Sequence, residues 1–147
     1  MTHEDALAAV PLFSQLEHKD LARLAKSAVS RKYAPGDAIV GEGEQAVAFY
    51  VIVSGKVEVS KGGQLLNTLG AGDFFGEMSL LDGHPRVATL KAIDPTECLV
   101  IARWDFTAEL NTDPSIAASM LPTLSRRIRN LEEHILELEA RIRELGG

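Results

Sequence analysis

The sequence predicts an α+β, mainly β protein: a jelly-roll β-barrel flanked by short N-terminal helices and a long C-terminal helix. Three segments with different periods support this fold class. Residues 2–30 and 104–147 carry apolar side chains at helical spacing, whereas residues 31–103 alternate short β-rich runs with turn signals. Many short strands at even spacing are typical of an all-β sandwich or barrel, and the jelly roll fits this pattern best.

The N-terminal segment predicts short helices that are interrupted at Pro11. Thr2 can cap the first of them, and Asp5 places a carboxylate in its first turn, where the helix dipole favours negative charge. After the proline, apolar residues recur at helical spacing at Leu16, Leu21, Leu24, Ala25 and Val29.

The central segment contains the predicted strands. Turn signals such as Pro35-Gly36-Asp37 and Gly62-Gly63 divide it into short runs. In the run KVEVS, at residues 56–60, valines alternate with polar residues, and this period of two indicates a half-buried strand.

The C-terminal segment predicts a short helix at residues 104–110 and a longer helix after it. The longer helix begins at Asp113-Pro114, because Asp caps helices well and Pro suits the first helical position. Pro122 lacks a backbone N–H, so it should either kink this helix or restart it.

Length, charge and targeting signals limit the possible functions. The chain has 147 residues, enough for one domain with a core. Its formal net charge of −6 disfavours non-specific binding to nucleic acid or to an anionic membrane. The N-terminus lacks a signal-peptide pattern, and no run approaches the roughly 18 apolar residues of a membrane span, so we expect a cytoplasmic protein.

Cysteine and histidine usage argues against a metal centre. A single cysteine, Cys98, excludes an internal disulfide, a CxxC zinc site and a four-cysteine iron–sulfur cluster. It lies in the apolar run CLVIA, so we interpret it as a buried small hydrophobe. The four histidines are scattered, and we expect His3 and His84 to lie in solvent.

The segment GAGDFFGEMSLLDGHPRVATLKA, at residues 70–92, carries the candidate binding chemistry. Gly76 permits close backbone approach, and residues 77–81 predict one helical turn whose free N–H groups suit an anion. The guanidinium of Arg86 matches a phosphate, while Glu77 can accept a hydrogen bond from a sugar hydroxyl. A phosphate beside a ribose hydroxyl would use all of these groups. Taken alone, Glu77 could be only a helix-start carboxylate and Arg86 only a surface charge.

The stretch FGEMSLLDGHPRVATLKA, at residues 75–92, resembles the phosphate-binding cassette of cyclic-nucleotide-binding domains. These domains occur in protein kinase A regulatory subunits, nucleotide-gated channels and catabolite-activator-type regulators. The upstream stretch YAPGDAIVGEGEQAVAFYVIVSG, at residues 33–55, resembles the opening strands of the same family. The resemblance extends from about Val10 through the helix after Pro114, and is strongest to the sensor domains of the catabolite-activator/FNR group.

The resemblance implies a set of ligand contacts. Glu77 would bind the ribose 2′-hydroxyl, Arg86 would pair with the cyclic phosphate, and Gly76 and Ala88 would supply backbone N–H groups. The remaining expected binding residues are Phe75 before Gly76, Met78 and Ser79 on the short cassette helix, and Val87 beside the arginine.

The expected ligand is cyclic AMP, with cyclic GMP as the alternative. Many family members have Ser or Thr after the arginine, and a hydroxyl there is linked to cyclic GMP recognition. Val87 departs from that pattern, and kinase-type domains with Ala at this position still bind cyclic AMP. The valine therefore favours cyclic AMP, although its bulk could also weaken binding.

The C-terminal helix carries an unbroken heptad pattern that predicts a parallel homodimer. The flanking charges agree, because Arg127 would face Glu132 of a partner and His134 would face Glu139. We therefore divide the chain into a binding domain at residues 1–121 and a dimerisation helix at 122–147. The alternative, packing on the chain's own barrel, is expected for the first turns only. The apolar positions of the seam are Leu121, Leu124, Ile128, Leu131, Ile135, Leu138, Ile142 and Leu145.

In the catabolite-activator group the corresponding helix also reaches the nucleotide base. The matching stretch here is about residues 130–134, which makes Leu131 and Glu132 the base-contact candidates, with Arg127 and Arg129 as alternatives. The chain ends without residues for the helix-turn-helix that follows in that group. We therefore expect the chain as given not to bind DNA specifically.

These patterns predict a non-enzymatic sensor. No nucleophile–base pair, metal cluster or carboxylate dyad stands out in the sequence, which argues against an enzyme. The alternatives are a ligand-free dimerisation scaffold of the same fold, a sensor of another small anion, and the sensor fragment of a transcription regulator that lacks its DNA-binding domain.

Overall fold

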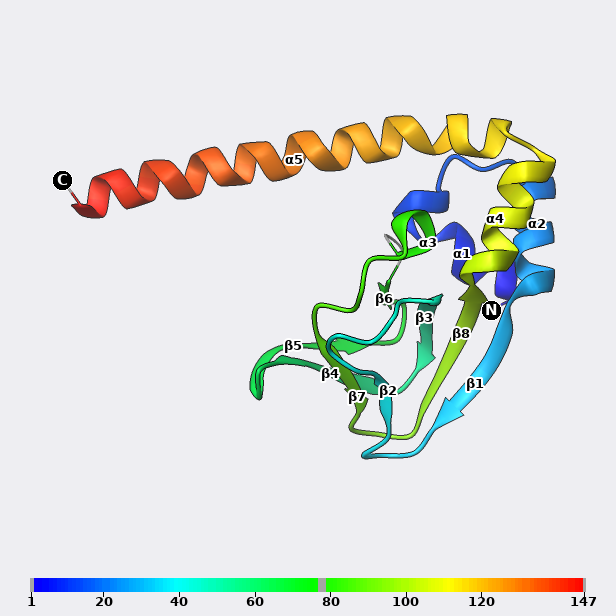
Figure 1. Cartoon of the computed structure of the whole chain (residues 1–147), viewed down its shortest axis with the longest axis horizontal. Coiled ribbons are helices and arrows are strands. Elements are labelled where there is room, and N and C mark those ends of the chain that lie inside the picture. Colours follow the sequence, from blue (N-terminus) through cyan, green and yellow to red (C-terminus); the bar gives the residue numbers. More distant parts are fainter. Residues whose placement is uncertain (1, 77–78, 147) are drawn as a thin grey trace.

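The computed structural model describes residues 2–76 and 79–146 (Figure 1). Its N-terminal part forms α1 (His3–Ala8), the 3-10 helix η1 (Pro11–Phe13) and α2 (His18–Ser27). Thr2 caps α1 as predicted: the Asp5 N–H donates to Thr2 Oγ1 at 3.1 Å, and the Thr2 N–H donates to Asp5 Oδ2 at 3.2 Å. This reciprocal pair satisfies two donors at the start of the helix.

In the described residues, eight strands form two antiparallel four-stranded sheets with the orders β1-β8-β3-β6 and β2-β7-β4-β5. The predicted succession of helices, strands and helices, with a jelly-roll fold at its centre, is confirmed. The strands are β1 (Val29–Tyr33), β2 (Ala38–Val40), β3 (Ala48–Ser54), β4 (Lys56–Lys61), β5 (Gln64–Gly70), β6 (Phe74–Phe75), β7 (Thr89–Ala92) and β8 (Thr96–Ala102).

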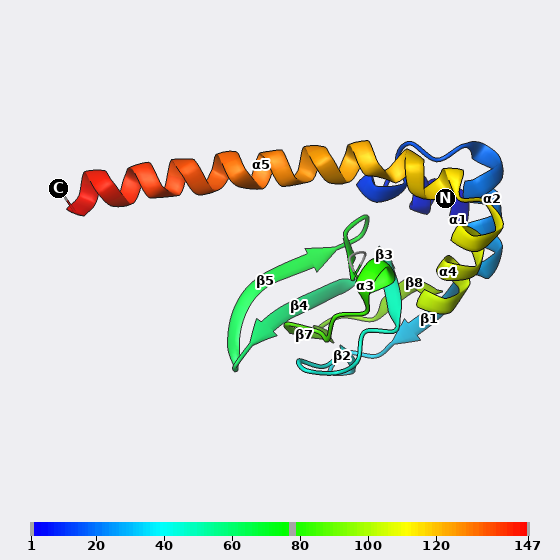
Figure 2. The same cartoon turned by 45° about the horizontal axis from the view of Figure 1, so that its top comes forward.

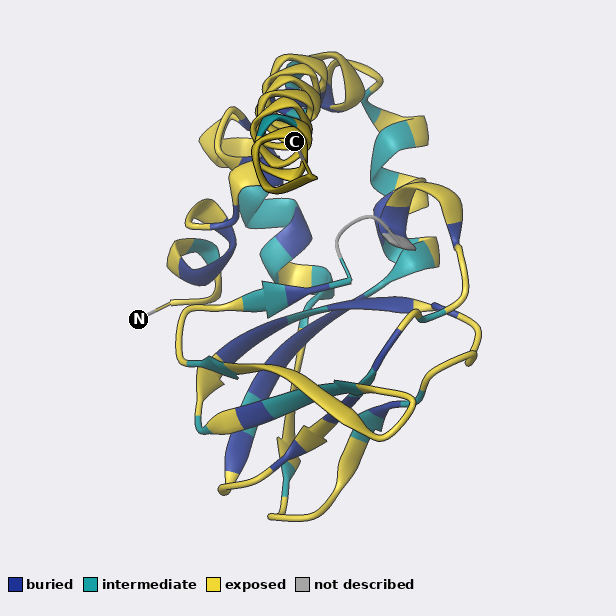
Figure 3. Ribbon diagram, turned by 90° about the vertical axis from the view of Figure 1, so that its left-hand side faces the viewer, coloured by how far each residue is buried: buried dark blue, intermediate teal, exposed yellow. Residues whose placement is uncertain are grey.

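Burial along the strands follows the alternation in the sequence. Strand β4 is the run KVEVS with one further lysine, and in it Val57 is fully buried while Lys56 is exposed. Cys98, on β8, is also fully buried and lies in the core cluster between the sheets with Ile52 and Val57. The prediction that Cys98 serves as a small core hydrophobe is therefore confirmed. Figure 3 shows buried residues on the strands and also on the helices packed against them.

A second core cluster joins the helices to the first sheet. The ring of Phe13 meets Phe49 of β3 edge to face at 5.6 Å and lies 5.9 Å from Phe106. All three rings are fully buried, so they fix the helical layer against the sheet.

An ion-pair network around Arg23 attaches α2 to the helices that follow the strands. Arg23 contacts the buried carboxylate of Asp20, Glu109 Oε2 at 3.3 Å and Asp113 Oδ2 at 3.6 Å. Because the three carboxylates come from α2, from α4 (Arg103–Thr112) and from the junction between α4 and α5 (Ser115–Gly146), one guanidinium holds these segments together.

A short helix, α3 (Ser79–Asp82), lies between β6 and β7, and α4 (Arg103–Thr112) and α5 (Ser115–Gly146) follow the last strand. The short helix predicted at residues 104–110 is thus confirmed and extends at both ends. The predicted cap is also present, since the Ser115 N–H donates to Asp113 Oδ1 at 3.1 Å.

Helix α5 continues through Pro122 as one helix, so the alternative of a restart there is wrong. Proline's fixed φ is compatible with a helix; Pro122 loses the hydrogen bond to the carbonyl of Ala118 and its ring crowds that carbonyl, but the helical turns on both sides continue. Ile116 and Met120 of its first turns are buried against the domain, as expected. The rest of α5 extends beyond the sheets with its side chains mostly exposed (Figures 1 and 2). Within residues 2–76 and 79–146, no helix has the length and apolar character required to cross a membrane.

Candidate functional site

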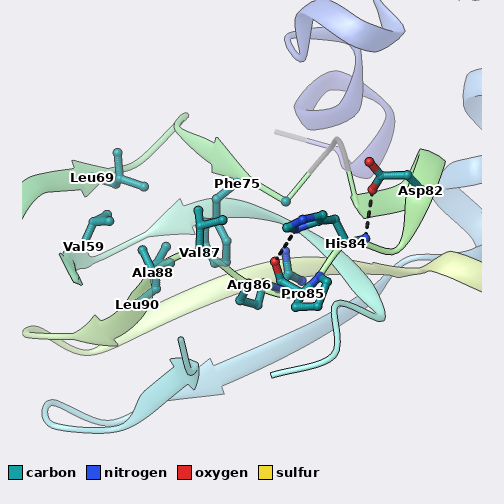
Figure 4. Close-up of a pocket in the computed structure, with 11 residues that line it drawn as sticks. Val59, Leu69, Phe75, Asp82, His84, Pro85, Arg86, Val87, Ala88 and Leu90 are labelled. Atoms are coloured by element: carbon teal, nitrogen blue, oxygen red, sulfur yellow. Dashed lines mark hydrogen bonds between the residues drawn. The ribbon is translucent and has the colours of Figure 1, made fainter. Parts of the chain in front are cut away.

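A cavity of about 480 Å³ opens beside the second sheet (Figure 4). It is lined by β4 and β5, by the end of β6, and by the chain from the end of α3 into β7. Five of the ten residues predicted to bind ligand therefore lie together: Phe75, Gly76, Arg86, Val87 and Ala88. The other lining residues are Val59, Leu69, Asp82, His84, Pro85 and Leu90.

Arg86 is held at this cavity through its backbone and its side chain. Its N–H donates to the carbonyl of Glu44 at 2.9 Å, and its carbonyl accepts from the Gly43 N–H at 2.8 Å. Its guanidinium donates to the carbonyl of Ala48 at the start of β3. These contacts fix the half-buried guanidinium before any ligand arrives, which favours binding because little ordering remains to be done.

An aromatic stack supports the arginine. The rings of Tyr50 and Phe75 are stacked, with centroids 4.7 Å apart and an interplanar angle of 10°. The guanidinium carbon of Arg86 lies 5.7 Å from the Tyr50 ring centroid, within cation–π distance. The stacked rings of Tyr50 and Phe75, from the paired strands β3 and β6, therefore form an aromatic platform against which the guanidinium packs.

Burial determines the electrostatics of this pair. It raises the pKa of the Tyr50 phenol, and the positive charge of Arg86 opposes that effect. Burial also lowers the pKa of Arg86, while Tyr50 and Glu44 act in the opposite direction. Arginine stays protonated at any ordinary pH, so a partly desolvated positive charge lines the cavity.

Gly76 has a backbone conformation that favours glycine, with a φ of +84°. A β-carbon at this position would collide with the guanidinium of Arg86 and would lie 3.1 Å from the carbonyl oxygen of Ala48. The absence of a side chain at residue 76 therefore provides the space that the arginine occupies.

Some of the residues predicted to contact the ligand in the segment 76–86 lie outside the described residues. Glu77 and Met78 lie outside them, as does the side chain of Ser79. The described part of the predicted helical turn is α3, which starts at Ser79 and ends at Asp82. His84 is exposed as expected; its N–H donates to Asp82 Oδ1 at 2.9 Å, and its Nδ1 lies 2.9 Å from the carbonyl oxygen of Pro85.

The predicted base contacts are not brought to the cavity. Leu131 and Glu132 lie on the exposed part of α5, and none of the described residues that line the cavity comes from this helix. Of the alternatives, Arg127 lines a separate cavity between α5 and η1, and Arg129 is exposed. The assignment of a base contact to any of them stays a prediction.

Sequence reasoning missed Tyr50 and the apolar wall formed by Val59, Leu69 and Leu90. A signal for Val59 was present, because the alternation in KVEVS places it on the same face as the buried Val57. Tyr50 had no comparable signal in the binding motif, since it reaches the site through strand pairing.

In the described part of the chain, no three His, Cys, Asp or Glu residues are placed to hold a metal ion.

Comparison with known proteins agrees with this geometry. The chain is 36% identical over 136 residues to the cyclic AMP receptor protein of Thermus thermophilus, covering 88% of this chain and 63% of that protein. It is 37% identical over 131 residues to the cAMP-dependent protein kinase regulatory subunit of Debaryomyces hansenii, covering 88% of this chain and 29% of the subunit. The chain thus spans less than two thirds of either relative.

A solved structure shows the same fold. The N-terminal domain of a transcriptional regulator from Streptomyces coelicolor superposes with a TM-score of 0.80 at 30% identity, covering 88% of this chain and 96% of that domain. The profile of the cyclic nucleotide-binding domain matches residues 30–113, which include all the residues that line the cavity. The chain therefore belongs to the cyclic nucleotide-binding domain family.

Proposed function

We propose that this chain is a non-enzymatic cyclic AMP sensor that binds the nucleotide in the cavity at Arg86 and relays binding to a dimerising α5. The observation that carries the proposal is the guanidinium of Arg86, fixed by Ala48 and Tyr50 at the wall of a cavity of ligand size. Membership of the nucleotide-binding family supports it independently.

The cyclic phosphate would pair with Arg86. A guanidinium presents five donors in a planar fork that matches a phosphate, and partial burial strengthens such a charge pair. The apolar wall of Val59, Leu69 and Leu90 provides a surface against which the uncharged part of the nucleotide packs.

The sugar contacts rest on the resemblance of residues 75–92 to the family cassette. Glu77 would accept a hydrogen bond from the ribose 2′-hydroxyl, and Gly76 and Ala88 would present backbone N–H groups. Phe75, Met78 and Ser79 complete the proposed set on this side of the ligand.

Cyclic AMP is proposed over cyclic GMP because of Val87. This side chain lines the cavity and is 63% exposed, so it stands where a ligand would meet it. It offers no hydroxyl to hydrogen-bond a guanine base. The names of the two relatives given above, both of which refer to cyclic AMP, support the same choice.

The relay would operate through α5. Its apolar seam from Ile128 to Leu145 is exposed in the single chain, and that surface favours pairing with a second copy in parallel. Ligand binding would shift the population toward the state in which α5 closes over the base, with Leu131 or Glu132 as the contact. This requires the nucleotide to bind the closed state more tightly than the open one.

Calorimetric titration with cyclic AMP and cyclic GMP tests the binding. We expect saturable heat with cyclic AMP, weaker binding of cyclic GMP, and a loss of at least a hundredfold in affinity in Arg86→Ala. Arg143→Ala, which removes an exposed arginine near the end of α5, is the matched control and should bind as the unmodified chain does. If neither nucleotide produced heat or a thermal shift, the chain would instead be a dimerisation scaffold of this fold.

The relay is tested separately by spin-label distances between the two α5 helices of the dimer. We expect the distance distribution to change when cyclic AMP is added. Unchanged distances in a protein that binds cyclic AMP would reject the relay while leaving the binding proposal intact.

A further inference from the structure

A second cavity, of about 580 Å³, lies between the loop at residues 45–47 and one face of α4. The residues that α4 contributes recur at helical spacing, so they form one continuous wall. The cavity is within the size range of small-molecule sites in proteins. It is lined by Gln45, Ala46, Val47, Arg103, Trp104, Thr107, Ala108 and Asn111, none of which lines the cavity at Arg86.

Among the described residues, the wall of this cavity carries one positive charge and no carboxylate. Arg103 is the one charged side chain among the described residues that line it. Its Nε is buried and has no hydrogen-bond partner within the part of the chain that the structure describes. A partly buried cation without a carboxylate beside it is stabilised by any anion that can reach it, because the anion offsets the cost of desolvation.

The position of Arg103 is fixed by the fold. Its N–H donates to the carbonyl of Val47 at 2.8 Å, and its guanidinium packs against Gly83 at the point where a β-carbon would otherwise stand. Gln45 reaches the same residue, since its Nε2 donates to the carbonyl of Gly83 at 3.0 Å. The charge is therefore held in place and does not sit on a freely moving side chain.

The rest of the wall suits an aromatic or apolar group. Trp104 is 65% exposed, although a tryptophan of a folded domain usually buries much of its indole. Val47 is also exposed and Ala108 adds apolar surface, while Ala46 lines the cavity but is almost fully buried. The amide of Asn111 adds a hydrogen-bonding group to the same wall.

We propose that this second cavity binds a small organic anion in which a carboxylate is attached to an aromatic or apolar group. The carboxylate pairs with the guanidinium of Arg103, whose planar fork suits a bidentate contact. The apolar group packs against Trp104 and Val47 and removes their surface from water. The proposal does not depend on nucleotide binding at Arg86.

The chain provides its own reporter, because Trp104 is its single tryptophan. The probe is phenylacetate, followed by the emission of Trp104 in the full chain. The neutral isostere phenylacetamide and the ring-free anion acetate are the controls. We expect a saturable blue shift with phenylacetate and at least tenfold weaker binding of both controls. Equal responses to phenylacetate and phenylacetamide, or no saturation with phenylacetate, would overturn the proposal.

Variants of Arg103 then test whether its guanidinium binds the carboxylate of phenylacetate. Arg103→Gln should weaken phenylacetate binding at least tenfold, Arg103→Lys should weaken it less, and Arg143→Gln should leave it unchanged. Because Arg103→Gln also removes the contact with Gly83, the test must not rest on this variant alone. In the unmodified chain, NMR perturbations should cluster at the indole N–H of Trp104 and the side-chain amides of Gln45 and Asn111. Displacement of phenylacetate by cyclic AMP, with perturbations at Tyr50 and Val87 instead, would overturn the assignment.

Discussion

The guanidinium of Arg86 occupies the space that a β-carbon on residue 76 would need. Gly76 also has a φ of +84°, a conformation that costs other residues about 1–2 kcal/mol. Gly76→Ala should therefore lower the free energy of unfolding by about 1–2 kcal/mol and, by displacing the arginine, weaken cyclic AMP binding at least tenfold.

Gly72→Ala is the matched control for this prediction. Its φ is +90°, but no atom lies within 4 Å of an added β-carbon. This variant should lose similar stability in denaturant unfolding while its calorimetric affinity changes less than threefold. Equal losses of affinity in both variants would show that backbone strain, and not the displaced guanidinium, is the cause.

The aromatic platform should contribute to both stability and binding. Tyr50→Leu removes the stack with Phe75 and the ring beneath Arg86, contacts of about 0.5–1.5 kcal/mol each. We expect it to lower cyclic AMP affinity three- to tenfold, measured by calorimetry. Tyr50→Phe keeps the ring and should remain within twofold of the unmodified chain; a loss as large as that of Tyr50→Leu would assign the effect to the hydroxyl.

Two neighbouring residues of α5 provide a direct test of the dimer. Ile135 and Leu136 are 53% and 63% exposed, but only Ile135 lies on the heptad seam. Ile135→Asn should weaken dimerisation at least tenfold, because it places an amide in the apolar seam, whereas Leu136→Asn should not. Sedimentation velocity over a range of protein concentrations measures both. Equal weakening would place the interface elsewhere on the helix.

Stability should fall at alkaline pH because of Cys98. Burial raises the pKa of its thiol from 9.0 to about 11. The unfolded chain then loses this proton first, so the stabilisation is complete below pH 9 and disappears as the pH rises toward 11. The change amounts to about 2–3 kcal/mol for this group.

Urea unfolding at pH 8, 9.5 and 10.5 tests this expectation. Cys98→Ala is less stable at every pH because it leaves a cavity, but its free energy of unfolding should fall less steeply across this range. Tyr33, whose pKa burial raises to about 12, remains in both proteins and sets the common background. Parallel pH profiles for the two proteins would exclude Cys98 as the source.

The sequence predicted the parts of the site that are local in the chain. Gly76, Arg86 and Val87 belong to one motif, so spacing and resemblance alone could indicate that they lie together at one cavity. Tyr50 could not be found in this way, because it reaches Phe75 through the antiparallel pairing of β3 with β6. Strand register depends on tertiary packing, and no local pattern specifies the partner of a given residue.

In the C-terminal helix, too, some features could be predicted from the local sequence and others depend on tertiary packing. Its heptad spacing and its cap at Asp113 are local, and the cap is present as predicted. The sequence alone does not decide between a kink and a restart at Pro122, because the helical turns on both sides determine whether the lost hydrogen bond is tolerated. The direction of α5 away from the sheets depends on the burial of Ile116 and Met120, which spacing alone does not reveal.

The anchoring of α5 at one end makes it a mechanical lever. Its 32 residues span about 48 Å at a rise of roughly 1.5 Å per residue, with the buried contacts confined to the first turns. A tilt of roughly 10° at this base would move the far end by about 8 Å, on the same helix geometry. Rearrangements at the base that are small compared with a side chain therefore become large displacements near Leu145.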